Sequence, residues 1–298
     1  MLKNLKRTIA IKAFKKRKAL KYILFDKLYS IFILNRKNIP EFVNNYDKEG
    51  FVKISPKIDK ELKNLKSNLV ISNDKNKIKL MHGEEKLNNK PPFYFDINDN
   101  VKNSIDEILK KLEKSYIFDL KKYFRSEILP AFICLRRNEF YKKQDLDHEL
   151  FNDNFHNDAY LFTQFKIFIN LNDIGEKNGP MRIVSKKNTK KFLDSIGYTG
   201  RQNYNEKKDT ISYSNVGKSG DGLIFDPTNC FHKAGVPDQN YKRDYLIITY
   251  VCIPDCQKNL YTTDIYKYNQ NELLRLSKPT KLNQTLKLFL NFYKKRVN

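Results

Sequence analysis

Short runs of β-branched and aromatic residues, each ending at turn-forming residues, limit this chain to a fold built mainly from strands. One run covers residues 159–171 and ends at Asn172-Asp173. Three more cover residues 181–184, 223–225 and 245–253. This composition is typical of β-strands. The last run contains so few polar residues that we expect it to be buried on both faces.

The residues between these runs have turn chemistry. Glu176-Lys177-Asn178-Gly179-Pro180 separates the first two runs, and Asn-Gly is a strong signal for a tight turn. We therefore expect residues 159–171 and 181–184 to pair as a hairpin. Asp226-Pro227-Thr228-Asn229 ends the third run.

Two histidines and an aspartate stand at the ends of these predicted strands. His156 and Asp158 precede the first run, and His232 follows the third. Two imidazoles and one carboxylate make up the facial triad of non-haem Fe(II) oxygenases, which leaves three coordination positions open. Arg243 comes 11 residues after His232, and a guanidinium can hold the far carboxylate of a dicarboxylate co-substrate with two hydrogen bonds. The pattern indicates a 2-oxoglutarate-dependent oxygenase.

Each of these residues also has an ordinary interpretation, which the surrounding motifs make less favourable. His156 and Asp158 could form a surface turn, His232 could be a core histidine, and Arg243 could be a solvated charge. Asn170 is a polar residue within an apolar strand. It is a candidate hydrogen-bond donor to the co-substrate, or it satisfies a neighbouring backbone group. Gln164 and Lys166 rank below it for the same role.

Several stretches of the chain resemble the phytanoyl-CoA dioxygenase family of Fe(II)/2-oxoglutarate oxygenases. The segment from Tyr46 to Ile54, with the helix-like residues 57–69, looks like the beginning of the family's domain, and the resemblance extends over roughly residues 46–256. Four motifs occur in the family's order: FHNDAY, NGPMRIV, GDGLIFDPTNCFHKAG and RDYLIITYV.

The resemblance implies a mainly β fold with flanking helices, a double-stranded β-helix or cupin-like jelly roll. It implies that His156, Asp158 and His232 hold Fe(II) and that Arg243 pairs with the C5 carboxylate of 2-oxoglutarate. The implied reaction uses O2 to hydroxylate a small-molecule or lipid- or sugar-linked substrate and releases succinate and CO2. The chain departs from the family at Ser185-Lys186-Lys187-Asn188, where the family usually has Pro-Gly-Ser-His, so substrate contacts there are not carried over.

Charge divides the chain into three parts. The net charge is +23, yet residues 1–40 alone contain twelve Lys or Arg and one acidic residue, and residues 257–298 contain nine and two. We therefore expect a jelly-roll domain at residues 41–256 between two basic helical extensions. Residues 1–40 have the pattern of a basic amphipathic helix, which can lie on an anionic membrane; packing on the barrel is equally open.

Two other classes of function remain open on the sequence alone. The jelly roll could bind a metal or ligand without catalysis, or the basic ends could make the chain a scaffold on a membrane surface or a nucleic acid. No motif for specific nucleic-acid binding accompanies the basic ends. The absence of a long apolar run or a signal-peptide core predicts a cytoplasmic protein, with peripheral membrane contact left open. The sequence identifies neither the substrate nor the oligomeric state.

Overall fold

The computed structural model describes most of the predicted jelly-roll domain. Most of the two predicted basic extensions, residues 1–35 and 267–298, lies outside the described residues, and residues 36–40 are not helical. No helix in the described part of the chain combines the length and the hydropathy needed to cross a membrane. The described residues are 36–72, 92–141, 154–158, 164–196, 203–204, 211–253 and 264–266.

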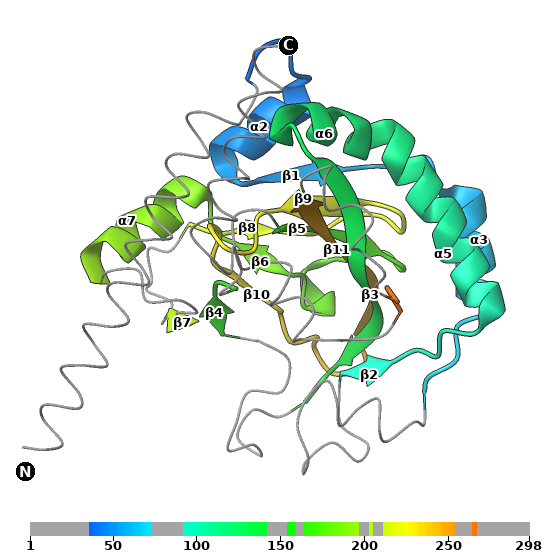
Figure 1. Cartoon of the computed structure of the whole chain (residues 1–298). Helices are drawn as coiled ribbons and strands as arrows, with labels where there is room; N and C mark the ends of the chain where they lie inside the picture. The colour runs from blue at the N-terminus through cyan, green and yellow to red at the C-terminus, as the bar shows by residue number, and fades with distance from the viewer. Residues whose placement is uncertain are drawn as a thin grey trace, which may run out of the picture.

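Two antiparallel sheets form the body of the protein, with strand orders β1-β9-β5-β11-β3-β2 and β7-β4-β10-β6-β8 (Figure 1). This confirms the predicted fold class, a mainly β jelly roll with flanking helices. The larger sheet contains β1 (Phe51–Ile54), β2 (Phe93–Tyr94), β3 (Glu127–Glu139), β5 (Gln164–Asn170), β9 (Gly222–Phe225) and β11 (Lys242–Ile253). The smaller sheet contains β4 (Phe155–His156), β6 (Arg182–Ile183), β7 (Asn203–Tyr204), β8 (Tyr213–Ser214) and β10 (His232–Lys233).

Helices cover the outer side of the larger sheet (Figure 1). The longest, α5, begins after Asn98, whose side chain accepts a hydrogen bond from the Val101 amide at 3.0 Å and so caps the helix. A fifth helix, α7, begins at Lys186, within the stretch where the chain departs from the family's pattern. The helices are α2 (Glu41–Glu49), α3 (Asp59–Ser67), α5 (Asp99–Leu112), α6 (Phe118–Phe124) and α7 (Lys186–Ile196), with a π-helical turn, Glu113–Ile117, between α5 and α6.

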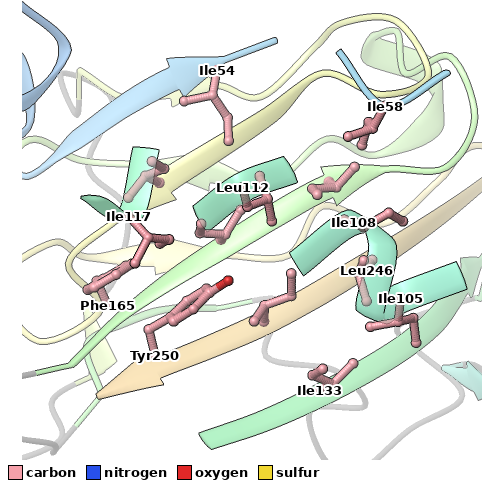
Figure 2. Packing of buried hydrophobic residues seen from close by; sticks show 14 of the residues in the cluster. Ile54, Ile58, Ile105, Ile108, Leu112, Ile117, Ile133, Phe165, Leu246 and Tyr250 are labelled. Carbon is pink, nitrogen blue, oxygen red and sulfur yellow. The ribbon is translucent and has the colours of Figure 1, made fainter. Parts of the chain in front are cut away.

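The main hydrophobic core lies between the larger sheet and the helices α2, α3, α5 and α6 (Figure 2). Leu246 and Ile248 of β11 are fully buried in the same cluster as Ile105 and Ile108 of α5. Successive side chains of a strand point to opposite faces, so Arg243, Tyr245 and Ile247 of β11 point toward the second sheet. The last predicted strand is therefore confirmed, and it is buried on both faces as expected.

The predicted hairpin is wrong. β5 pairs with β9 and β11 in the larger sheet, whereas β6 pairs with β10 and β8 in the smaller one. The Asn178-Gly179 signal is real but local, because Gly179 has a φ of 62° and ends a 3-10 helix. A Cβ there would lie 2.4 Å from the Val236 carbonyl carbon. The turn requires a glycine, but a turn residue does not determine which strands pair.

Candidate metal centre

The smaller sheet brings the two predicted histidine ligands together. His156 of β4 and His232 of β10 are direct partners in an antiparallel pair, and their ring centroids lie 4.5 Å apart. Asp158 follows β4 by two residues, and its carboxylate completes a group whose ligand atoms all lie within 4.8 Å of one another. All three side chains are buried, with exposed fractions of 2–6%. The structure therefore assembles the three residues that the sequence pattern singled out.

A backbone carbonyl orients each imidazole. Nδ1 of His156 lies 2.8 Å from the Asn154 carbonyl oxygen, and Nδ1 of His232 lies 3.0 Å from that of Cys230. A carbonyl can only accept a hydrogen bond, so both Nδ1 atoms carry the proton. Nε2 then bears the lone pair in each ring. Such an outer hydrogen bond fixes the tautomer that a metal ligand needs.

The electrostatic state of the group also suits a divalent cation. Burial and the neighbouring His156 lower the pKa of His232 to about 3, so its imidazole is neutral at physiological pH. Burial acts to raise the pKa of Asp158, but Lys166 and the two histidines outweigh it and hold that pKa well below its usual range. The site thus offers two imidazoles, of which that of His232 is neutral, and one carboxylate.

The turn after β9 holds the His156-Asp158 segment in place. The Asp158 amide donates to the Pro227 carbonyl at 2.7 Å, and the side chain of Asn157, which is fully buried, donates to the Thr228 carbonyl at 3.1 Å. The Asp226 carboxylate accepts from the Thr228 amide at 2.9 Å, which shapes the turn. Asp226-Pro227-Thr228-Asn229 therefore does more than end a strand, because it anchors Asn157 and Asp158.

Arg243 lies on the inner face of the larger sheet with donors that lack partners. It is 3% exposed, its guanidinium packs 4.7 Å from the Tyr245 ring centroid, and burial lowers its pKa. Within the described part of the chain, its Nε and Nη1 atoms make no hydrogen bond. Buried donors without partners are costly, so this guanidinium is suited to an anionic ligand.

Two asparagines add donors of the same kind. Asn170 is 2% exposed, and its Nδ2 has no partner among the described residues, as expected of a residue that donates to a ligand. Asn138 is fully buried, and its Nδ2 also has no partner among the described residues. Its Oδ1 accepts a hydrogen bond from the Tyr245 hydroxyl at 3.1 Å. Asn170 is the cross-strand partner of Tyr245, and Asn138 that of Arg243.

A series of ring contacts links this donor group to the metal centre. The rings of His232 and Phe225, of Phe225 and Phe168, and of Phe168 and Tyr245 have centroids 5.0, 5.4 and 5.5 Å apart. Both groups therefore line one interior between the sheets, at different depths. Lys166 lies at the level of the metal centre and Asn170 at the level of the donor group. They are four residues apart on one face of β5, roughly 13 Å along the strand.

Sequence reasoning did not select Asn138 and ranked Lys166 below Asn170. Asn138 could have been found as a polar residue near the end of the long strand β3, but nothing local shows that β3 lies beside Arg243. Lys166 was on the right strand, yet only the fold shows that its ammonium lies 2.5 Å from Asp158 Oδ2. Both residues owe their position to strands that are distant in sequence.

Comparison with known proteins identifies solved structures but no family. No family model matches the chain, so the resemblance to the phytanoyl-CoA dioxygenase family stays a prediction. No curated protein matches either. The solved structures described next share only 10–13% sequence identity with this chain, and identities that low do not transfer an activity.

Among the similar solved structures is the non-heme alpha ketoglutarate dependent epimerase SnoN from nogalamycin biosynthesis, with a TM-score of 0.46, 13% identity, and coverage of 82% of this chain and 95% of SnoN. EctD from S. alaskensis with bound Fe has a TM-score of 0.48 and 10% identity, covering 84% and 90%. HygX from Streptomyces hygroscopicus with nickel and 2-oxoglutarate bound has a TM-score of 0.42 and 12% identity, covering 81% and 99%.

Proposed function

We propose that this protein is an Fe(II)- and 2-oxoglutarate-dependent oxygenase. The observation that carries the proposal is the buried convergence of His156, Asp158 and His232 within 4.8 Å. Both imidazoles are oriented through Nδ1, which leaves their Nε2 atoms as ligands. Two nitrogen donors and one carboxylate are the set found in non-haem Fe(II) oxygenases. When bound there, iron supplies the oxidising chemistry with dioxygen, and the protein supplies binding and orientation.

The donors around Arg243 support 2-oxoglutarate as the co-substrate. The Nε and Nη1 atoms of Arg243 are buried donors that have no partner among the described residues. The same holds for the Nδ2 atoms of Asn138 and Asn170. A carboxylate placed between them would accept several charge-assisted hydrogen bonds at once. The series of ring contacts puts this donor group and His232 in one interior between the sheets, which is where the proposal places the co-substrate. The proposed roles are C5-carboxylate binding for Arg243 and amide donation for Asn170.

The proposed reaction is hydroxylation of a small-molecule or lipid- or sugar-linked substrate, with release of succinate and CO2. The chain's own residues would bind and orient the reactants and exclude water from a buried site. Basic residues at 1–40 support a further proposal, that the protein works at an anionic membrane surface on the cytoplasmic side. Sedimentation with vesicles of neutral lipid alone and with added anionic lipid would test this part separately.

The experiment for the main proposal compares the wild-type protein with His156→Ala and Asp158→Ala. Under anaerobic conditions, Fe(II) and 2-oxoglutarate together should give the wild type a weak visible charge-transfer band, and both variants should lack it. In air, the wild type should convert 2-oxoglutarate to succinate even without its substrate, at a slow rate. Lys218→Met, which removes an exposed ion pair with Asp173, serves as the control and should behave as the wild type does.

Three outcomes would contradict the proposal in different ways. A wild type with neither the band nor succinate is not an iron/2-oxoglutarate enzyme. A wild type that develops the band but makes no succinate, with or without candidate substrates, is the non-catalytic binding protein that forms the alternative. Unchanged turnover in His156→Ala or Asp158→Ala would place the chemistry elsewhere in the molecule.

A further inference from the structure

A lysine faces the candidate metal centre from the opposite sheet. Lys166 is in the middle of β5, where its strand neighbours are Thr249 of β11 and Phe225 of β9. Its Nζ lies 2.5 Å from Oδ2 of Asp158. The lysine side chain is 19% exposed and the aspartate side chain 8% exposed, so this ion pair is almost entirely removed from water.

The two oxygens of Asp158 face different neighbours. Oδ1 lies 4.0 Å from Nε2 of His156, the ring nitrogen that bears the lone pair. Oδ2 accepts a hydrogen bond from Lys166. Nitrogen and oxygen ligands that share one metal at about 2.0–2.2 Å lie roughly 3 Å apart. Oδ1 is therefore placed to become a ligand after a small movement, while Oδ2 is held away from that role.

We propose that Lys166 is a positioning residue that makes Asp158 a one-oxygen ligand and balances its charge before a metal binds. The proposal rests on the metal centre of the proposed function. It has a direct chemical consequence, because three protein ligand atoms leave three positions on a six-coordinate metal. A chelating co-substrate takes two of these, and dioxygen needs the third. An aspartate that bound through both oxygens would remove that third position.

A purely structural role explains this ion pair less well. Removing two opposite charges from water is costly, and well-packed apolar residues usually stabilise a core at least as well as a buried pair. The neighbouring inner-face positions of the same strand include Phe168, so the interior accepts large apolar side chains. A lysine beside a ligand carboxylate instead matches the outer partners that orient ligands in metal sites.

The test uses Co(II) as the probe, because its visible spectrum reports the number and arrangement of its ligands. Lys166→Met removes the charge and keeps most of the volume, and Lys166→Arg keeps both the charge and a donor. Lys218→Met is the matched control, since Lys218 pairs with Asp173 at 3.2 Å with side chains that are 84% and 64% exposed. Co(II) is added anaerobically to each protein, and thermal unfolding is recorded with and without the metal.

We expect Lys166→Met to bind Co(II) with a changed spectrum, and Lys166→Arg to restore the wild-type spectrum. Without metal, Lys166→Met leaves Asp158 buried and unpaired, so its unfolding midpoint should fall by on the order of 5–10 °C, and Co(II) should recover most of the loss. A Lys166→Met spectrum that superimposes on the wild type overturns the proposal. So does an equal loss of midpoint with and without metal, which a structural role predicts. If the wild type binds no Co(II), the result contradicts the metal centre of the proposed function.

Discussion

On β11, the side chains of Leu246, Ile248 and Tyr250 point toward the helices, whereas those of Arg243 and Tyr245 point toward the second sheet. The first set is fully apolar apart from one hydroxyl and packs in the main core. In the second set, Nε and Nη1 of Arg243 have no partner in the described ranges, and neither have the Nδ2 atoms of the nearby Asn138 and Asn170. One strand thus has one face that packs in the main core and one face that presents buried donors suited to a ligand.

β5 shows the same division. Phe165, Ile167 and Ile169 belong to the main core, while Lys166 and Asn170 face the interior. Sites of this kind violate the rule that buried polar groups are satisfied, and natural proteins do so mainly where function requires it. The contrast between the two faces leads to opposite expectations for substitutions that are adjacent in sequence.

The largest expected effect is on the apolar face. Leu246→Ala removes a fully buried side chain from the main core, so the free energy of unfolding should fall by roughly 2–5 kcal/mol. Urea unfolding measures this, and the protein that remains folded should bind 2-oxoglutarate with wild-type affinity. Val70→Ala, at a position that is 59% exposed, is the control and should change stability by less than about 0.5 kcal/mol. Equal losses in the two variants would contradict the assignment of this face as the core.

The second-largest effect is expected on the interior face, where a substitution should weaken ligand binding without lowering the free energy of unfolding of the ligand-free protein. Arg243→Met should weaken 2-oxoglutarate binding about 100-fold, since a buried partner of a carboxylate is lost. The ligand-free protein should be no less stable than the wild type, and up to about 1–3 kcal/mol more stable, because two unpaired buried donors are gone. Calorimetric titration and urea unfolding measure the two quantities.

Arg182→Met is the matched control for this pair of measurements, because Arg182 is 43% exposed and pairs with Glu176 at 3.7 Å. It should leave both quantities close to those of the wild type. If Arg243→Met is instead destabilising and binds 2-oxoglutarate normally, Arg243 has a structural role, and the two faces of β11 do not differ in function.

The smallest effect concerns pH. The folded pKa of His232 is lowered to about 3, so this residue takes up a proton on unfolding at any pH between about 3 and 6.5. The metal-free protein should therefore lose stability as pH falls below about 6.5. Between pH 6.5 and 5, His232 should contribute roughly 1.5 kcal/mol of that loss. His232→Gln should show a correspondingly shallower decline in urea unfolding; an equal decline would mean that His232 is not held neutral.

Sequence reasoning has most to work with where the chemistry belongs to the residue type. His156, Asp158, His232 and Arg243 could be selected because few side chains bind metals or clamp carboxylates and because turn residues mark strand ends. Strand positions were predictable for the same local reason, since β-branched and aromatic runs have a clear pattern. The hairpin between residues 159–171 and 181–184 could not be judged this way, because each strand pairs with segments about 30 to 90 residues away.

The amino-acid sequence alone was sufficient to select the three candidate metal-binding residues and to predict a mainly β fold, because side-chain chemistry and alternating apolar patterns belong to single residues and short segments. The folded chain was needed to show that His156 and His232 pair across two strands, that backbone carbonyls orient both rings, and that Lys166 and Asn138 face the interior. Orientation, burial and charge pairing depend on which distant strands become neighbours, and long-range packing decides that.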